Sequence, residues 1–223
     1  MPPDVLALFD LDHTLLPHDT DEQWVDFLLE RGVLERATFE AANRDLAARY
    51  GRGEAGALEF TEFYLSTLAG RPSDELEALR RDFIAERVQP VISTAARALI
   101  ARHATQGHLV VMTTGVSRFL TEPIAHALGV AHLIATEPER KDGLYTGRVA
   151  GTPNMQDGKV ERLFDWLEAR GQSLSDFRES WFYSDSQNDL PLLSHVTHPV
   201  AVNADPSLAA HARLSGWRQL SIR

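Results

Sequence analysis

Two carboxylate-rich motifs in this sequence follow short apolar runs. Asp10-Leu11-Asp12-His13-Thr14 comes directly after the run at 5–9, and Ser184-Asp185-Ser186-Gln187-Asn188-Asp189 after the run at 181–183. If the two motifs met, Asp10, Asp12, Asp185 and Asp189 would repel one another unless a cation lay among them or some were protonated. An all-oxygen site of this kind suits Mg²⁺, which takes one or two carboxylates together with substrate phosphate.

Two other segments carry groups that bind phosphate. Thr113-Thr114-Gly115 follows the apolar run at 109–112 and is predicted to open a helix, where hydroxyl and backbone N–H groups form a seat for phosphate. Which threonine fills this role is left open, with Thr114 favoured. Lys159 also opens a predicted helix and would add a point charge there. The chain has two lysines, Lys141 and Lys159, against twenty arginines.

Each of these pieces also has an ordinary structural interpretation. An Asp-Leu-Asp sequence can be a polar turn, and Thr-Thr-Gly can be a helix N-cap. Asp185 and Asp189 can be a cap and a first-turn acid that the helix dipole favours. Lys159 can be a solvated lysine at a helix start. The occurrence of all four pieces at the ends of successive apolar runs favours a single reaction centre.

The elements that must position these residues alternate between apolar runs and helical patterns. The runs at 5–9, 109–112 and 181–183, with a shorter candidate at 200–202, are typical of parallel strands buried on both faces. Val160, Leu163, Phe164 and Leu167 have the spacing of a helix face. This alternation predicts a doubly wound α/β fold, in which ligands bind outside the carboxyl ends of the strands.

The stretch from 17 to 87 interrupts the alternation. It contains no convincing strand, and helices are predicted near 21–31, 35–50, 54–69 and 73–87. We therefore predict a helical domain of residues 17–87 inserted into an α/β core domain of residues 1–16 and 88–223. Residues 144–149, after the turn at 141–143, are predicted to form a β-hairpin arm.

Composition excludes several classes of protein. Twenty-two basic against thirty-two acidic residues give a formal charge of −10, which disfavours binding to nucleic acid or to anionic membranes. The absence of cysteine excludes disulfides, thiolate zinc sites and cysteine nucleophiles. No apolar stretch approaches the roughly 20 residues of a membrane span, and no signal peptide is recognised, so a cytoplasmic protein is expected. The sequence leaves monomer and homodimer open.

In order and spacing, these motifs resemble those of the haloacid dehalogenase superfamily, in its phosphoserine-phosphatase-like branch with a helical cap after the first motif. Asp10-x-Asp12-x-Thr14 resembles motif one and Thr113-Thr114-Gly115 resembles motif two. Gly158-Lys159-Val160 resembles motif three, and the segment 184–189 resembles motif four. The resemblance covers essentially the whole chain and extends to histidinol-phosphatases of this branch.

The resemblance implies a Mg²⁺-dependent phosphatase that acts on a small-molecule phosphomonoester. Asp10 would attack phosphorus and form an aspartyl phosphate, while Asp12 would protonate the leaving oxygen and then activate water. The metal would be held by the Asp10 carboxylate, the Asp12 backbone carbonyl and Asp185, with Asp189 beside them. The phosphoryl group would be bound by Thr114, Gly115 and Lys159, with Asn188 and Asp189 orienting the lysine and the metal shell.

Two alternatives stay open at this level. A dehalogenase expels halide, which needs no proton, so an acid at Asp12 favours a phosphatase. A non-catalytic regulatory protein phosphorylated on aspartate would also bear an Asp at a strand end beside Mg²⁺. Such a regulatory protein would need neither the helical insert nor an acid at Asp12.

The sequence predicts the substrate less sharply than the reaction. Asp19 lies nine residues after Asp10. The resemblance to phosphoserine phosphatases implies a residue at this spacing that holds the substrate ammonium, which in those enzymes is a Glu. Asp21 and Glu22 lie beside Asp19 and would favour an amine-bearing substrate such as histidinol phosphate or phosphoserine. Phosphoserine would also need an arginine for its carboxylate, for which Arg49 and Arg52 are candidates. In the alternative interpretation, Thr20 is an N-cap and the acids occupy the first turn of a helix.

Overall fold

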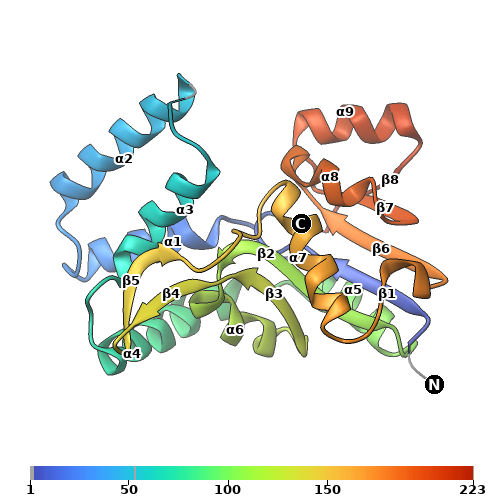
Figure 1. The fold of residues 1–223 in the computed structure, drawn as a ribbon, viewed down its shortest axis with the longest axis horizontal. Coiled ribbons are helices and arrows are strands. Elements are labelled where there is room, and N and C mark those ends of the chain that lie inside the picture. Colours follow the sequence, from blue (N-terminus) through green and yellow to red (C-terminus); the bar gives the residue numbers. More distant parts are fainter. Residues whose placement is uncertain (1–2, 53, 223) are drawn as a thin grey trace.

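The computed structural model describes residues 3–52 and 54–222, and its centre is a six-stranded sheet (Figure 1). All paired neighbours in this sheet are parallel, in the order β3-β2-β1-β6-β7-β8. The doubly wound α/β fold predicted from the sequence is confirmed. The strands are β1 Val5–Phe9, β2 Leu109–Ser117, β3 His132–Thr136, β6 Glu179–Ser184, β7 His198–Val202 and β8 Arg218–Leu220.

Both faces of the sheet are covered, which explains why its central strands are continuously apolar. Ala7 and Phe9 of β1 belong to one hydrophobic cluster, while Leu6 and Leu8 belong to a second. The first cluster includes residues of α5 Thr94–Ala104 and α6 Arg118–Ala127. The second includes residues of α7 Asp157–Glu168, α8 Leu190–Leu193 and α9 Pro206–Ser215. Successive side chains of β1 therefore enter different cores.

Within the described part of residues 17–87 the regular elements are all helical, and none of these described residues is in a strand. Figure 1 shows α2 standing away from the sheet, while α1 and α4 lie closer to α6. The helices are α1 Thr20–Glu30, α2 Arg36–Gly51, α3 Ala57–Leu65 and α4 Ser73–Phe83. A 3₁₀ turn at Ser66–Leu68 follows α3, and a π-turn at Ile84–Val88 and a 3₁₀ turn at Gln89–Val91 follow α4. No described helix is long and apolar enough to cross a bilayer.

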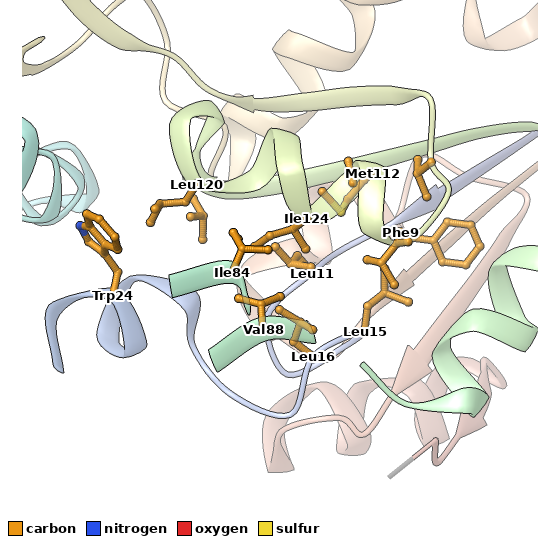
Figure 2. Packing of buried hydrophobic residues seen from close by; sticks show 14 of the residues in the cluster. Phe9, Leu11, Leu15, Leu16, Trp24, Ile84, Val88, Met112, Leu120 and Ile124 are labelled. Carbon is orange, nitrogen blue, oxygen red and sulfur yellow. The ribbon is translucent and has the colours of Figure 1, made fainter. Parts of the chain in front are cut away.

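Aromatic packing attaches α1 and α4 to the α/β part of the chain. The Trp24 ring of α1 lies 5.3 Å from the Phe83 ring of α4 and 6.0 Å from the Phe119 ring of α6, measured between centroids. Figure 2 shows Trp24, Ile84 and Leu120 within the same cluster of buried side chains. The inserted helices thus share a core with one face of the sheet. The domain boundaries at 16/17 and 87/88 stay a prediction.

A β-hairpin packs against the inserted helices near the end of α3. Its strands are β4 Pro138–Lys141 and β5 Leu144–Val149, as predicted for the arm at 144–149. The backbone N–H of Gly70 donates to the carbonyl of Tyr145 at 3.0 Å. Gly147 has φ +84°, and a Cβ there would approach Ser66 Cα to 3.2 Å, so glycine allows β5 to lie directly against the end of α3.

His103 makes the stability of the fold depend on pH. It is buried at the end of α5, where Nε2 lies 2.8 Å from the Tyr183 hydroxyl and Nδ1 2.8 Å from Nδ1 of His108. Burial, with repulsion from His108 and Arg102, lowers the pKa of His103 to about 4. Because the unfolded chain takes up this proton at higher pH, the contribution of His103 to stability is complete above about pH 6.5 and is lost as pH falls from there toward pH 4.

We expect the free energy of unfolding of a His103→Gln variant to fall less between pH 7.5 and pH 4.5 than that of the wild type. Urea denaturation at the two pH values measures this difference. His126→Gln, which changes an exposed histidine of α6, is the matched control and should leave the wild-type pH dependence in place. An identical pH dependence in the wild type and the His103 variant would contradict the assignment.

Candidate active site

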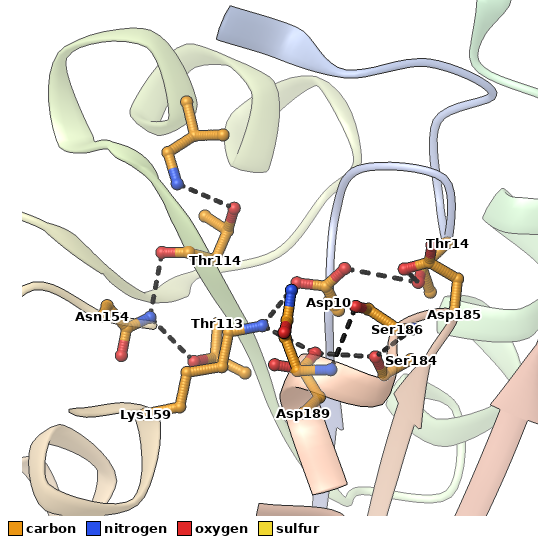
Figure 3. Close-up of polar contacts among 12 residues, drawn as sticks. Asp10, Thr14, Thr113, Thr114, Asn154, Lys159, Ser184, Asp185, Ser186 and Asp189 are labelled. Atoms are coloured by element: carbon orange, nitrogen blue, oxygen red, sulfur yellow. Dashed lines mark hydrogen bonds and ion pairs between the residues drawn. The ribbon is translucent and has the colours of Figure 1, made fainter. Parts of the chain in front are cut away.

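The strand order brings the predicted motifs to one edge of the sheet. Because β1 lies between β2 and β6, Asp10, Thr114 and Asp185 come from neighbouring strands or from the turns that follow them (Figure 3). A cavity of about 280 Å³ opens there. Its lining includes these residues from the sequence prediction: Asp10, Asp12, Asp19, Asp21, Glu22, Thr114, Gly115, Lys159, Asp185, Asn188 and Asp189.

Lys159, in the first turn of α7, is buried between two carboxylates. Its Nζ lies 2.7 Å from Oδ1 of Asp10 and 2.8 Å from Oδ2 of Asp189 (Figure 3). The Ser184 hydroxyl donates to the same Asp189 oxygen at 2.6 Å. Burial alone would lower the pKa of Lys159, but attraction to Asp10 and Asp189 outweighs burial and raises it. The ammonium therefore stays charged beside Asp10. Asn188 is exposed and lines the cavity, but among the described residues the hydrogen-bond partners of Lys159 are Asp10 and Asp189, so the predicted role of Asn188 in orienting the lysine stays a prediction.

Asp10 and Asp185 both contact the hydroxyl of Thr14. Thr14 Oγ1 lies 3.3 Å from Oδ2 of Asp10 and 3.2 Å from Oδ1 of Asp185. Burial raises the pKa of Asp10 to about 7 against the attraction of Lys159, and repulsion from nearby carboxylates adds to the increase. Burial also raises the pKa of Asp185. In the protein alone, ionisation of this pair is therefore disfavoured, as expected where carboxylates converge.

The donor set fits a magnesium ion. Within residues 3–52 and 54–222, no three or more His, Cys, Asp or Glu side chains form a ready metal cluster. Mg²⁺ does not require one, because it keeps several waters and takes one or two carboxylates. Asp10 and Asp185 provide two carboxylates within reach of one hydroxyl. Oδ2 of Asp189 accepts from Lys159 and from Ser184, as expected for a residue that orients the lysine, and its predicted place beside the metal stays a prediction.

Asp12 lies in the turn after β1, and its carboxyl group contacts the start of α1. The hydroxyl of Thr20 donates a hydrogen bond to Oδ1 of Asp12. Burial raises the pKa of Asp12 well above its ordinary value, repulsion from Asp19 and Asp10 adds to the increase, and the hydrogen bonds from Thr20 oppose it. A carboxyl group with a raised pKa is more readily protonated, which suits an acid that serves a leaving group.

Strand β2 continues beyond the segment predicted to open a helix. Thr113 and Thr114 pair with Ile134 and Ala135 of β3, and α6 begins only at Arg118. The prediction of a helix start at Thr113-Thr114-Gly115 is therefore wrong, because pairing with the neighbouring strand holds these residues in extended conformation. The groups predicted to bind phosphate lie at the end of a strand, three residues before α6 begins.

Asn154 distinguishes the two threonines. Its Nδ2 donates to the Thr113 hydroxyl at 3.0 Å and to the backbone carbonyls of Thr114 and Ile134 at 2.9 and 3.0 Å (Figure 3). Both threonines are buried, but Thr114 lines the cavity and Thr113 does not. The geometry thus favours Thr114 as the phosphate-binding threonine. No sequence pattern pointed to Asn154, which lies in a loop.

Two glycines allow the loop before Lys159 to pack closely. A Cβ on Gly158 would lie 2.2 Å from the carbonyl oxygen of Pro153, and a Cβ on Gly115 would lie 2.9 Å from Cγ of Met155. Real side chains do not tolerate the first distance, since it joins a carbon atom to a backbone oxygen. Glycine at 158 therefore permits the tight turn that starts α7 and directs Lys159 toward Asp10.

The acids at the start of α1 line the same cavity as the reaction centre. Asp19, not Thr20, is the N-cap of the helix, since its Oδ1 accepts from the N–H of Glu22 at 2.8 Å. Burial and the neighbouring Asp19 raise the pKa of Asp21, and the same two causes raise the pKa of Glu22. Tyr64 of α3 also lines the cavity, and burial together with these acids raises the pKa of its hydroxyl. This wall of the cavity would be stabilised by a cation.

The two arginines predicted to bind a substrate carboxylate do not line this cavity. Arg49 pairs with Glu59 at 2.5 Å, and Arg52 pairs with Glu54 at 2.6 Å. Both pairs lie in or next to α2 and α3. The candidate role of Arg49 and Arg52 is thus corrected, because local ion pairs hold both guanidinium groups. Among the described residues that line the cavity, Lys159 is the one lysine or arginine.

Comparison with known families agrees with this geometry. The model of the haloacid dehalogenase-like hydrolase family matches residues 7–194 of the chain. That range includes all of the motifs that line the cavity, from Asp10 to Asp189.

Similar proteins span almost the whole chain. A histidinol-phosphatase from Neisseria meningitidis is 38% identical over 98% of this chain and 99% of its own length. A phosphoserine phosphatase from Mycobacterium tuberculosis is 30% identical, over 97% of this chain and 70% of its own length. A crystal structure of a protein of unknown function from Bordetella pertussis is 46% identical, with a TM-score of 0.94 and 98% of both chains covered. A substrate-bound phosphoserine phosphatase, 20% identical with a TM-score of 0.66, covers 100% of this chain and 94% of its own and shares the fold.

Proposed function

Because this chain belongs to the haloacid dehalogenase-like hydrolase family, we propose that it is a Mg²⁺-dependent phosphatase that forms an aspartyl phosphate on Asp10. The strongest support is the buried contact of Lys159 with Asp10, at 2.7 Å, at the base of a cavity that Asp12 and Thr114 also line. A nucleophile, a cation for phosphoryl oxygens and an acid thus share one site. Two relatives named as phosphatases, from Neisseria meningitidis and Mycobacterium tuberculosis, support the same reaction class.

The proposed reaction has two displacements. In the first, an oxygen of Asp10 forms a bond to phosphorus while the ester P–O bond breaks. The electron pair of that bond goes to the leaving oxygen, which takes a proton from Asp12. In the second, a water molecule gives a proton to Asp12 as its oxygen attacks phosphorus, and the bond to Asp10 breaks. Inorganic phosphate is released and both carboxyl groups return to their initial states.

The phosphoryl group carries negative charge throughout, and this chain supplies groups to stabilise it. Lys159 provides a fixed positive charge, and the Thr114 hydroxyl and the N–H of Gly115 provide donors at the end of β2. Asp10, Asp185 and the backbone carbonyl of Asp12 would hold the metal. Bound Mg²⁺ would polarise the phosphoryl oxygens and neutralise the carboxylates around it.

Release of inorganic phosphate from p-nitrophenyl phosphate tests this function. We expect turnover with Mg²⁺, a loss of at least about 100-fold after chelation with EDTA, and recovery when Mg²⁺ is added back. Turnover that survives chelation would contradict the metal requirement. Release of chloride from 2-chloropropionate without phosphatase activity would favour a dehalogenase, and a long-lived aspartyl phosphate without turnover would favour a regulatory protein.

The proposed substrate is a small metabolite phosphate that bears an amine, in the class of histidinol phosphate and phosphoserine. Asp19, Asp21 and Glu22 on one wall of the cavity support a positive charge in the leaving group. No arginine is found among the described lining residues, which favours an amino alcohol phosphate without a carboxylate. The relative named histidinol-phosphatase supports the same class. A cytoplasmic location is inferred from the sequence alone.

An Asp21→Asn variant tests the proposed amine site. We expect KM for 2-aminoethyl phosphate to rise about 10-fold, because a charge-assisted hydrogen bond of about 1.5 kcal/mol is lost, while KM for neutral glycerol phosphate changes less than about twofold. Asp26→Asn, an exposed acid on the same helix outside the cavity lining, is the matched control. Equal effects of Asp21→Asn on both esters would remove the argument for a cationic substrate.

A further inference from the structure

Thr20 lies where the inserted helices meet the reaction centre. It is the first residue of α1 and is fully buried. Its hydroxyl donates to Oδ1 of Asp12, which belongs to the turn after β1, eight residues earlier in the chain. Among the described residues, Thr20 is the one that donates hydrogen bonds to the Asp12 carboxyl group.

This contact restricts the carboxyl group that the proposed reaction uses as an acid. A carboxyl group on a short side chain can rotate about its terminal bond, since that torsion has a broad minimum. A hydrogen bond to Oδ1 selects one orientation and leaves Oδ2 as the oxygen that carries the transferable proton. Proton transfer depends strongly on such orientation, and a misplacement of about 1 Å can cost about 100-fold in rate.

The same helical turn also carries the acids that line the cavity. Asp19 and Asp21 flank Thr20 in sequence, and both line the cavity, as does Glu22. Asp19 fixes this turn by accepting from the N–H of Glu22 at 2.8 Å. The start of α1 therefore combines three cavity-lining carboxylates with the hydroxyl that contacts Asp12.

We propose that Thr20 is a positioning residue for Asp12, whose hydroxyl orients the carboxyl group for proton transfer to the leaving oxygen. This inference rests on the proposed phosphatase function. A threonine whose role was merely to fill space or start the helix would affect esters that lack an amine alike, whatever their leaving group. A threonine that orients the acid affects most the substrates that need one.

The dependence of kcat/KM on the leaving group separates these two roles. p-Nitrophenol leaves readily without a proton, whereas the alkoxide of glycerol phosphate needs one, and neither ester carries an amine. For both esters kcat/KM reports the steps up to formation of the phosphoenzyme, so the later attack of water does not affect it. We expect Thr20→Val to lower kcat/KM about 10- to 100-fold for glycerol phosphate and less than about threefold for p-nitrophenyl phosphate.

Three further variants complete the test. Thr20→Ala removes the same hydroxyl without the branched side chain, so it serves if valine disturbs folding. Thr20→Ser keeps the hydroxyl and should restore kcat/KM for glycerol phosphate to within about threefold of the wild type. Thr121→Val removes a fully buried hydroxyl of α6, which donates to the Ser117 carbonyl at the end of β2, and should show no dependence on the leaving group.

Equal losses on the two esters, no loss on either, or failure of Thr20→Ser to restore activity would overturn the role of Thr20. Asp12→Asn, measured on the same two esters, separates this failure from failure of the proposed function. If Asp12→Asn depends on the leaving group and the Thr20 variants do not, only the positioning role is wrong. If wild-type protein releases no phosphate, or Asp12→Asn affects both esters equally, the proposed acid mechanism itself is wrong, and the role of Thr20 with it.

Discussion

An Asp10→Asn variant is expected to lose at least about 10⁴-fold in kcat for p-nitrophenyl phosphate, because the amide cannot act as the nucleophile in the proposed covalent step. Asparagine has nearly the shape of aspartate, and Lys159 keeps its contact with Asp189 at 2.8 Å. The variant should therefore fold. Rates of phosphate release measured with Mg²⁺ present, together with circular dichroism, check both expectations.

The covalent step itself can be detected in the wild type. Acid quenching during turnover of ³²P-labelled 2-aminoethyl phosphate should trap label on the protein, and peptide mapping should place it on Asp10. Asp10→Asn should trap none, while Asp26→Asn, which changes an exposed acid of α1, should trap as much as the wild type. Label on another residue, or full activity of Asp10→Asn, would exclude Asp10 as the nucleophile.

A Lys159→Met variant is expected to lose both activity and stability. Removing a fixed charge beside the reacting phosphoryl group should lower kcat/KM by about 10²- to 10³-fold. The change also leaves Asp10 and Asp189 buried without their cation, which should cost about 3–5 kcal/mol in the free energy of unfolding. This loss should be smaller at pH 5 than at pH 8, because acid protonates the uncompensated carboxylates.

Lys141→Met is the matched control for this experiment. Lys141 is the other lysine of the chain and lies exposed at the end of β4. Its loss should change neither kcat/KM nor the free energy of unfolding by more than about 0.5 kcal/mol, as is usual for surface substitutions. Similar effects of the two lysine variants would show that Lys159 acts only through the total charge of the protein.

The sequence alone predicted four strands of the central sheet, β1, β2, β6 and β7, and the polar residues at their ends, while β3 and β8 were not predicted. Each apolar run is a local signal of a strand buried on both faces, and the run at 5–9 is entirely buried in β1. Parallel strands end at the same edge of a sheet, so polar residues after each run were expected to meet. Asp10, Asp12, Lys159 and Asp185 line one cavity, while their catalytic roles stay predictions.

Sequence patterns were less informative for segments whose conformation depends on partners. Thr113-Thr114-Gly115 has the composition of a helix start, but pairing with β3 keeps it in a strand. Thr20 has the residue type of an N-cap, yet Asp19 caps the helix. Arg49 has the charge that a substrate carboxylate would need, but it forms an ion pair with Glu59. In each case the local sequence was compatible with two structures, and contacts with neighbouring residues selected one of them.

The sequence by itself determined the fold class, the order of the motifs and the carboxylate and lysine groups available for chemistry, because these follow from local patterns of burial and residue type. Tertiary structure decided which threonine faces the cavity, where the arginines point and what holds Asp12. Those outcomes depend on hydrogen bonds and ion pairs between segments that different elements bring together. Asn154 and Thr113, for example, are 41 residues apart, and no pattern within either segment encodes their contact.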